Sequence, residues 1–407
     1  MWTFLSLAFR GLVRNRGRSL LTLLAITVGV GVVIFGSAFG EGVVDTMVQQ
    51  VVNARAGALQ VHRKGYMDSM DAAPLKLDLP DSGAVLEATR STPGVRAVTR
   101  RIRFGGMLNN GTRSSMVMGA GLDPVEEFAV CPDRRAEVPE TGTHVRADAD
   151  HGAVLGGELA RSYGVKPGDT LTVTAAGREG AVNALDIDVV GLTRGAAALE
   201  SKRQLMVPLS HAQGLLGMPG RVTEYVVAVD DLRQLHDVQA RLSARLGPEY
   251  EVHSWEQVMP FLYGTVGRMR MILGGVSLVL FVMVVFGVIN TMLMSVYERV
   301  REIGTMLAVG MRRGQVLRLF LLEAAALGLV GGGLGAVLGL AATLYYSGAG
   351  IVISPPGSVV QQVVRPEASP AVALAAVAVA MVGALLAAAY PAARAARMNP
   401  VDALRTV

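Results

Sequence analysis

Four long apolar segments dominate the pattern of hydrophobic and polar positions along this 407-residue chain. They run over residues 19–39, 271–297, 319–346 and 368–393, and Glu323 is the only charged residue within them. A helix needs about 20 apolar residues to cross a hydrocarbon core of about 30 Å, because each residue adds about 1.5 Å. The pattern therefore predicts four transmembrane helices.

The arginines beside these segments predict how the chain is oriented, because Lys and Arg in short flanking loops stay on the cytoplasmic side. They form three groups, before the first segment, between the second and third, and after the fourth: Arg10, Arg14, Arg16 and Arg18; Arg299, Arg301, Arg312, Arg313 and Arg318; and Arg394, Arg397 and Arg405. All three groups predict cytoplasmic termini and a large domain outside.

The segment between the first two spans has the pattern of a soluble α+β domain. Residues 171–174 and 186–190 alternate at the period of a strand, and residues 225–229 form a short buried-strand run. A helix is predicted from Leu232, Leu235, Val238 and Leu242, with Asp231 and Gln234 as a capping pair. Turns are expected at Pro93-Gly94, Asn110-Gly111, Pro167-Gly168 and Pro219-Gly220. Two subdomains are expected, with residues 123–150 inserted between them.

The predicted fold class is therefore a membrane α-helical protein with an α+β extracytoplasmic domain inserted between helices 1 and 2. The expected parts are a cytoplasmic interfacial helix (1–18), TM1 (19–40), the periplasmic domain (41–270), TM2 (271–297), a cytoplasmic loop (298–318), TM3 (319–346), a short periplasmic loop (347–367), TM4 (368–393) and a cytoplasmic tail (394–407). The basic, apolar N-terminus could instead be a signal peptide, but its apolar run is longer than the usual 7–15 residues.

Composition agrees with a membrane protein, since 51% of residues are hydrophobic and 17% charged. A net charge of +5 argues weakly for nucleic acid, because the arginines lie beside apolar segments. We therefore expect no nucleic-acid partner. The single cysteine, Cys131, excludes an intramolecular disulfide, and whether its thiol is modified stays open.

Catalytic and metal-binding patterns are missing from the sequence. The six histidines show no close ligand spacing, and Glu126, Glu127 and Glu158 fit ordinary solvated carboxylates. A P-loop requires a Gly-Lys dipeptide, which occurs nowhere in the chain. We expect no enzyme, no metal site and no cofactor here, so that ATP and magnesium would be bound by a partner.

The loop between the second and third spans contains an amphipathic helical pattern. Ile303, Met306 and Leu307 form its apolar face, and Gly310 can end the helix. The candidate ATPase-coupling residues are Glu298, Arg299, Arg301, Glu302, Ile303, Gly304, Met306, Leu307 and Gly310. An ordinary amphipathic connector is the alternative.

Two further groups of residues suggest packing and substrate surfaces. Glycines at four-residue spacing allow close helix packing in lipid, and they are Gly331, Gly335 and Gly339 on the third span and Gly36 and Gly40 on the first. Apolar residues at the outer ends of the first two spans could accept acyl chains or pack together: Phe35, Phe39, Val43, Val44, Met47, Met259, Phe261, Leu262 and Met269. Glu323 is expected to snorkel or to pair with an arginine.

Several stretches resemble the FtsX/MacB/lipoprotein-releasing (LolC/LolE-like) permease family of ABC transporters. They are residues 8–16, the loop 297–315, residues 320–323 and the C-terminal residues 390–405. In the external domain, residues 121–124, 154–160 and 163–169 resemble the lipoprotein-releasing branch. The short connection 175–184 departs from it, since chaperone recruitment there uses a protruding loop.

The resemblance implies a permease subunit that passes cytoplasmic ATP hydrolysis to a periplasmic domain in a bacterial inner membrane. The implied partners are a cytoplasmic ABC ATPase, a second permease copy or paralogue, the lipid bilayer, and a periplasmic lipoprotein chaperone or adaptor. Extraction of lipoproteins or another amphiphile is the leading interpretation. A MacB-like exporter of antibiotics or peptides and an FtsX-like regulator of a cell-wall hydrolase are the alternatives, and a membrane receptor would require a signalling domain.

Overall fold

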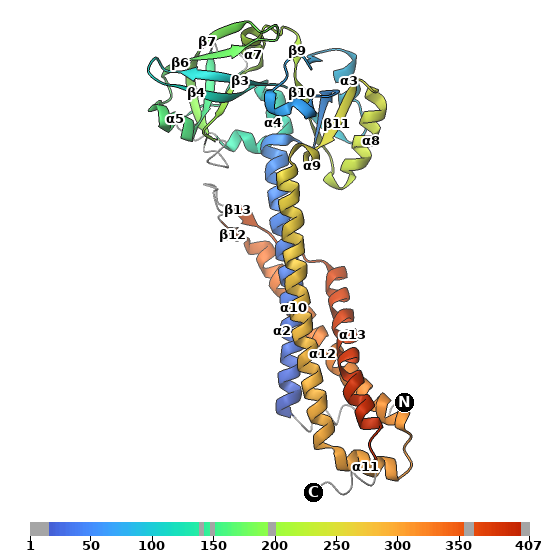
Figure 1. The fold of residues 1–407 in the computed structure, drawn as a ribbon. Helices are drawn as coiled ribbons and strands as arrows, with labels where there is room; N and C mark the ends of the chain where they lie inside the picture. Colours follow the sequence, from blue (N-terminus) through green and yellow to red (C-terminus); the bar gives the residue numbers. More distant parts are fainter. Residues whose placement is uncertain (1–15, 138–141, 147–150, 194–200, 354–361, 400–407) are drawn as a thin grey trace. The chain divides into compact units, whose positions relative to one another are not determined.

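The computed structural model describes residues 16–137, 142–146, 151–193, 201–353 and 362–399 (Figure 1). They form two compact units. The first contains residues up to Val44, Val266–Ile351 and the chain from Val363, and the second contains Asp45–Thr265 with Val352–Gln362. The interfacial helix predicted for residues 1–18 lies outside the described residues, apart from Arg16 to Arg18, which begin the first long helix.

Four long apolar helices confirm the four predicted spans: α2 (Arg16–Val51), α10 (Pro260–Glu298), α12 (Arg313–Ala349) and α13 (Pro370–Ala396). Both α2 and α10 extend well beyond the apolar stretches from which they were predicted. The chain is therefore a multi-pass membrane protein.

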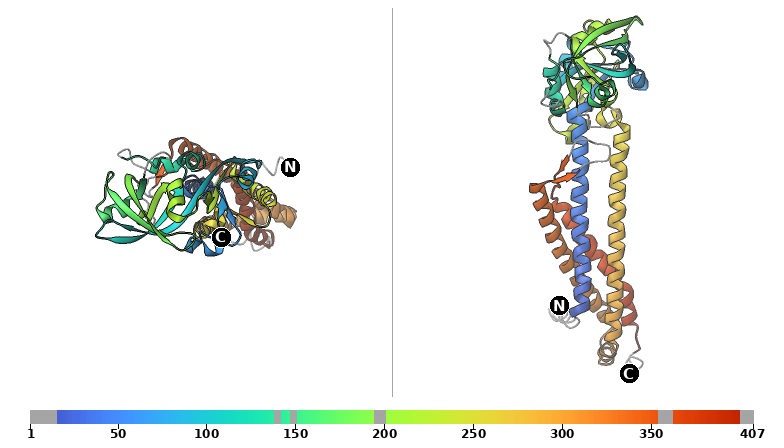
Figure 2. Two further views of the ribbon diagram at one scale, coloured as in Figure 1. Left: turned by 90° about the horizontal axis from the view of Figure 1, so that it is seen from above. Right: turned by 90° about the vertical axis from the view of Figure 1, so that its left-hand side faces the viewer.

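The membrane unit has a core of small and branched side chains. Ile26, Val30 and Ile34 of α2 pack with Val288 and Met292 of α10 and with alanines of α12 and α13. Figure 2 shows α2 in blue and α10 in yellow running along each other. A short helix, α11 (Val300–Ala308), connects α10 to α12.

The external unit is built on one nine-stranded sheet in the order β11-β1-β10-β3-β4-β8-β5-β7-β6. Its strands are β1 (Leu59–Arg63), β3 (Val95–Asn109), β4 (Ser114–Leu122), β5 (Gly152–Gly156), β6 (Thr170–Ala176), β7 (Val182–Thr193), β8 (Gln204–Pro208), β10 (Glu224–Val229) and β11 (Tyr250–Ser254). A second, small pair joins β2 (Leu79–Pro80) to β9 (Arg221–Val222).

Strand β3 joins the two halves of this sheet. Its first part pairs with β10, and its last residues pair with β6, which closes the second half onto itself through β4, β8, β5 and β7. The α-helices in the described part of this unit are α3 (Ala84–Arg90), α4 (Pro124–Val130), α5 (Gly157–Tyr163), α7 (Leu209–Leu216), α8 (Leu235–Leu246) and α9 (Trp255–Val258). In Figure 1, α3 and α8 lie at the end with β10 and β11, and α7 lies near β6 and β7.

The division into two subdomains remains a prediction: β3 runs through both halves of the sheet, and one apolar core spans them. That core includes Leu59 and Val227 at one end and Ile187 and Leu171 at the other. In the described part of residues 123–150, α4 packs on β3, and the short helix η3 (Pro132–Glu137) packs on η1 (Val52–Ala56), the π-type turn that follows α2.

Most local predictions for this domain are confirmed. The strands predicted at 171–174, 186–190 and 225–229 lie within β6, β7 and β10, and all four turn glycines have positive φ. Asp231 accepts a hydrogen bond from Arg233 N, but it caps the short helix η4 (Leu232–Gln234) that precedes α8. The sequence pattern missed a strand pair in the loop after α12, β12 (Ile351–Ile353) with β13 (Gln362–Val364).

Candidate functional site

Helix α11 forms where the chain reverses between α10 and α12. The apolar spacing that predicted it is present, and Gly310 ends it as expected: its φ is +101°, and Met311 N donates to Met306 O at 3.0 Å. Arg312 N then donates to Gln315 Oε1 at 2.9 Å as α12 begins. The helix is therefore fixed at its C-terminal end and at the start of the next helix.

The apolar face of α11 packs against its own chain. Ile303 is fully buried with Val296, Val316 and Phe320, and Met306 and Leu307 pack beside them. Gly304 is buried as well. The expectation that this face contacts another protein is therefore wrong for Ile303 and Gly304, because the ends of α10, α12 and α13 already cover it.

The opposite face of α11 is the exposed one. Arg301, Glu302, Thr305 and Ala308 are exposed, and Val309, directly after the helix, is 84% exposed. We call these five residues the outer face of α11. Val309 therefore takes no part in the chain's own core.

Glu323 was expected either to snorkel or to pair with an arginine, and it pairs with Arg299. Its carboxylate lies 3.5 Å from the guanidinium of Arg299, and both side chains are largely buried. The ion pair ties α12 to the segment between α10 and α11. A buried carboxylate near a membrane surface needs such a cation, because unpaired charge is costly there.

Glycines of α12 allow close contacts with two neighbouring helices. Gly331, Gly335 and Gly339 face α2: a Cβ on Gly335 would lie 2.6 Å from Thr27 O, and one on Gly339 would lie 2.9 Å from Gly31 O. Gly328 and Gly332 face α13 instead. The glycines at i, i+4 spacing therefore form a stripe along α12, on which the backbones of α12 and α2 nearly touch.

The two glycines expected to do the same on α2 are placed differently. A Cβ on Gly36 would meet no other described segment within 4 Å, so the expectation is wrong at this position. Gly40 faces Leu273 of α10 rather than α12. Gly31, which the spacing argument did not select, is the α2 glycine that meets α12.

The predicted substrate surface is covered in part. Val43 and Val44 are buried, and Met259 and Leu262 pack against the core of the external domain, so these four do not form an open acyl-binding face. Phe35 stacks on Phe39 and contacts Tyr346. Met47 and Met269 are half-buried, while Phe261 is 83% exposed.

An apolar cavity lies elsewhere, among α2, α10 and α13 within the membrane unit. Its volume is about 310 Å³, and small and apolar side chains line it, including Gly29, Ser277, Phe281, Ala376 and Val379. No pattern in the sequence predicted this cavity.

The external domain contains a buried network of charges that the sequence did not reveal. The guanidinium of Arg101 lies 2.7 Å from Glu127 Oε1 and 3.2 Å from Glu224 Oε1, and Arg134 lies 2.9 Å from Glu127 Oε1. His62 approaches Glu224 to 3.5 Å. The interpretation of Glu127 as a solvated carboxylate is wrong, because its side chain is 0% exposed.

The cations of this network stabilise the ionised forms of its two carboxylates. Burial alone raises the pKa of Glu224, but the neighbouring His62 and Arg101 outweigh it and lower the pKa to about 2. Burial also opposes ionisation of Glu127, and Arg101 with Arg134 reverses this and lowers its pKa. Arg101 and Glu224 face each other as cross-strand partners on β3 and β10, a pairing that no sequence pattern indicated.

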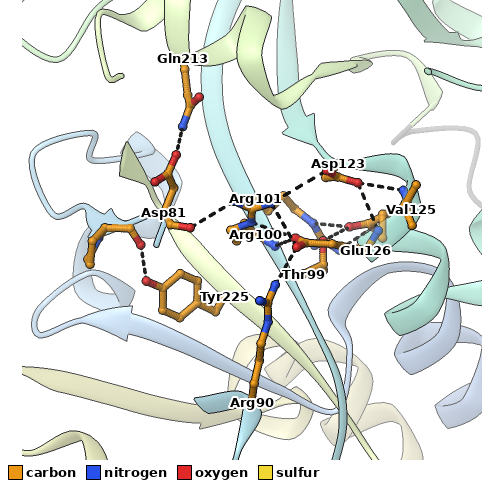
Figure 3. Close-up of polar contacts among 12 residues, drawn as sticks. Asp81, Arg90, Thr99, Arg100, Arg101, Asp123, Val125, Glu126, Gln213 and Tyr225 are labelled. Atoms are coloured by element: carbon orange, nitrogen blue, oxygen red, sulfur yellow. Dashed lines mark hydrogen bonds and ion pairs between the residues drawn. The ribbon is translucent and has the colours of Figure 1, made fainter. Parts of the chain in front are cut away.

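A second layer of ion pairs lies beside the buried network at the surface (Figure 3). Glu126 accepts from Arg100 Nε at 2.9 Å and from Arg90 Nη2 at 2.7 Å, and Arg100 also donates to Asp81 O. Asp123 caps α4 through Val125 N and Glu126 N. Glu158 pairs with Arg161 at the surface. Among the residues that the structure describes, no cluster of His, Cys, Asp or Glu is arranged to hold a metal.

These features define a class: a multi-pass membrane protein with four spans, a short helix between spans two and three, and an α/β domain between spans one and two. Comparison with protein families refines it. Residues 19–245, more than half of the chain, match the MacB-like periplasmic core domain, and residues 274–400 match the FtsX-like permease C-terminal domain. The chain belongs to this family of ABC transporter permeases.

Curated relatives carry the name macrolide export ATP-binding/permease protein MacB. The protein of Chromobacterium violaceum is 27% identical over 98% of this chain and 60% of its own length, and that of Marinobacter nauticus is 28% identical with the same coverage. The protein of Wolinella succinogenes is 26% identical over 85% of this chain and 54% of its own length. The chain thus spans about 60% or less of these relatives.

Two solved external domains are similar as well. The periplasmic region of MacB from Actinobacillus actinomycetemcomitans covers 53% of this chain and 97% of its own, with 13% identity and a TM-score of 0.36. The extracellular domain of a noncanonic ABC-type transporter, YknZ, from Gram-positive bacteria covers 48% of this chain and 100% of its own, with 13% identity and a TM-score of 0.35.

Proposed function

We propose that this chain is a mechanical permease, which carries movements produced by ATP hydrolysis in the cytoplasm to its external domain. The continuity of two helices supports this function. Helix α2 (Arg16–Val51) runs without a break from the membrane unit into the external unit, and so does α10 (Pro260–Glu298). A continuous helix resists bending because its backbone hydrogen bonds run along its axis, so it can transmit displacement.

ATP and magnesium would be bound by a cytoplasmic ABC ATPase subunit, with two permease copies or paralogues in one complex. The ATP-binding function in the relatives' name supports an ATPase that works with this permease, and these 407 residues contain no Gly-Lys dipeptide of a P-loop. The ATPase would contact the outer face of α11. This is a revision of the expected coupling surface, from the covered side of the helix to Arg301, Glu302, Thr305, Ala308 and Val309.

We place the permease in a bacterial inner membrane with its external domain in the periplasm, where a periplasmic adaptor could bind. The cargo class that the relatives support is a macrolide-like amphiphile, since they are named for macrolide export. Lipoprotein release is the second candidate, because residues 121–124, 154–160 and 163–169 resemble that branch. A chaperone would then take the place of the adaptor.

The test uses the permease and the ATPase that co-purifies with it, reconstituted in proteoliposomes and expressed in a strain without its own macrolide exporter. We expect macrolide-stimulated ATP turnover and a several-fold rise in macrolide tolerance that needs both proteins. Release of an acylated lipoprotein without any response to macrolide would establish the second candidate instead. ATP turnover that responds to neither cargo would contradict the transport function.

A further inference from the structure

The chain between the end of α2 and the first strand of the external sheet contains a π-type helical turn. After Val51 the helix continues for one π-type turn, η1 (Val52–Ala56), which ends at Gly57 with φ +64° and a hydrogen bond from Gly57 N to Val52 O. Strand β1 begins two residues later at Leu59. The last carbonyls of a helix lack partners within it and carry partial negative charge, so a helix end inside a domain needs donors from elsewhere.

Three donors from one neighbouring region meet these carbonyls. Arg101 Nη1, on β3, donates to Arg55 O at 2.9 Å, and Arg134 Nε, on η3, donates to Ala54 O at 2.9 Å. The thiol of Cys131, after α4, contacts Val52 O at 3.7 Å. Two of the donors are cations, which the negative end of a helix favours.

Buried carboxylates form ion pairs with both arginines and keep their guanidinium groups at the helix end. Arg101 bonds Glu127 and Glu224, and Arg134 bonds Glu127, all in a buried environment. Only 8% of the Arg134 side chain is exposed. Charge-assisted hydrogen bonds are stronger than neutral ones, and little water is present to compete for these carbonyls.

Helix α10 is attached to the same domain in a different way. It begins at Pro260 after a break at Met259, where φ is −125° and ψ is 64°. The preceding α9 contributes buried Trp255 and Val258, and Trp255 N donates to Ala58 O at 3.1 Å. This entrance therefore consists of apolar packing across a bend, whereas the α2 entrance consists of ionic hydrogen bonds to the helix end itself.

We propose that Arg101 and Arg134 act as a clamp that locks the end of α2 to β3 and η3. Movement of α2 then displaces the external sheet instead of being absorbed by bending at η1. The clamp rests on the proposed function, in which α2 transmits the movement. Arg101 and Arg134 are positioning residues in this function, and they contact no cargo.

The structural test measures how tightly α2 is held. Spin labels are placed at two exposed positions of the external unit, Gln49→Cys on α2 and Val125→Cys on α4, in a Cys131→Ser background that keeps a donor to Val52 O. Full-length permease is then studied by pulsed electron paramagnetic resonance. We expect one narrow distance distribution, and Arg134→Gln should broaden it and raise the population of a second distance by about tenfold or more, as expected for loss of a charged hydrogen bond.

The matched control is Arg100→Gln, which removes a surface ion pair from the neighbouring position of β3 and leaves η1 untouched. It should keep the narrow distribution. If Arg134→Gln does not fold, Arg134→Lys keeps the charge near Glu127 but lacks the Nε–H directed at Ala54 O, so it should broaden the distribution too. A reference-like distribution in Arg134→Lys, or in a folded Arg134→Gln, would overturn the clamp.

The functional readout separates the clamp from the proposed function. In proteoliposomes with the ATPase, Arg134→Gln should keep ATP turnover and lose about tenfold or more of the cargo moved per ATP, while Arg100→Gln keeps both. Unchanged cargo transport in Arg134→Gln would overturn the clamp alone. If the reference permease moves no cargo, the proposed function fails, but the distance measurement in the resting protein still decides whether the clamp exists.

Discussion

Two neighbouring glutamates of α4 stand in opposite environments. Glu127 is fully buried and shared by Arg101 and Arg134, while Glu126 lies near the surface between Arg90 and Arg100. A surface ion pair contributes little to stability, but removing one member of a buried pair leaves the other charge without compensation. Glu126 and Glu127 should therefore differ greatly in how much they contribute to the free energy of unfolding.

We expect Glu127→Gln to lower the free energy of unfolding by about 3–5 kcal/mol, because it leaves two buried arginines with one carboxylate fewer. The matched variant Glu126→Gln should cost about 1 kcal/mol or less. Thermal unfolding of the detergent-solubilised permease checks both variants. Equal losses in the two would show that the buried network does not stabilise the domain.

Acid should weaken the external domain partly through His144. Burial, followed by the nearby charge of Arg134, lowers the pKa of His144 from 6.5 to about 4. The unfolded chain then takes up a proton below pH 6.5, while the folded protein takes it up only near pH 4. Stability is therefore lost as the pH falls through this window.

We expect His144→Gln to lose less stability than the wild type between pH 7 and pH 4, by roughly 1–2 kcal/mol. From about pH 4.5 down to about pH 2, both proteins lose further stability, because Glu224 takes up a proton in the unfolded chain while its pKa in the folded domain is lowered to about 2. The measurement is the unfolding temperature at a series of pH values. Parallel pH curves for the two proteins would exclude His144 as a contributor.

At the scale of helices, the stripe on α12 determines how closely α2 can approach. Gly335→Ala should impair folding or assembly, because a Cβ there would overlap Thr27 O and Val30. Gly333→Ala is the control two residues away, where a Cβ would meet nothing within 4 Å. It should be neutral or slightly stabilising, since alanine favours helices by about 1 kcal/mol over glycine.

Yield of folded permease after detergent extraction, measured by size-exclusion chromatography and thermal unfolding, compares the two alanine variants. A tolerated Gly335→Ala would mean that α2 and α12 can move apart at this level without loss. The same result in both variants would show that the stripe does not control packing.

Helix α11 allows the coupling surface to be tested separately from the fold. Val309→Asp places a charge on an 84% exposed position, so it should cost the isolated permease little and weaken association with the ATPase by about tenfold or more, because the charge would be buried in the contact. Leu307→Asp is less informative, since Leu307 packs beside Ile303 and Phe320 and a charge there disturbs the permease itself.

Co-purification of the ATPase with each permease variant provides the measurement. Wild-type association of Val309→Asp would exclude this residue from the contact and return α11 to the role of a connector between α10 and α12.

For the whole molecule, the orientation in the membrane remains a prediction from the three groups of arginines. Single cysteines at two highly exposed positions, Val182→Cys in the external domain and Val309→Cys beside α11, test it in a Cys131→Ser background. In cells with a permeabilised outer membrane, an impermeant maleimide should label Val182→Cys and spare Val309→Cys. Labelling of the second cysteine alone would invert the topology and remove the basis for a cytoplasmic ATPase.

The sequence alone determined the features that depend on neighbouring residues. Four spans follow from apolar length, two strands follow from alternation and a third from a short apolar run. The end of α11 follows from Gly310, whose positive φ a glycine adopts without strain. The pairing of Glu323 with an arginine also followed from the cost of a lone charge in that place. In each case the properties of a short stretch of residues are enough to explain the feature.

Tertiary structure alone decided which faces are covered and by what. The amphipathic pattern of α11 identified its apolar face, but only the packing of α10, α12 and α13 showed that this face is already occupied. Spacing selected Gly36 as readily as Gly335, although only Gly335 meets another helix. Arg101 and Glu224 are 123 residues apart in the chain. Composition near either residue does not reveal the other, because their pairing arises only when β3 and β10 align and exclude water from both charges.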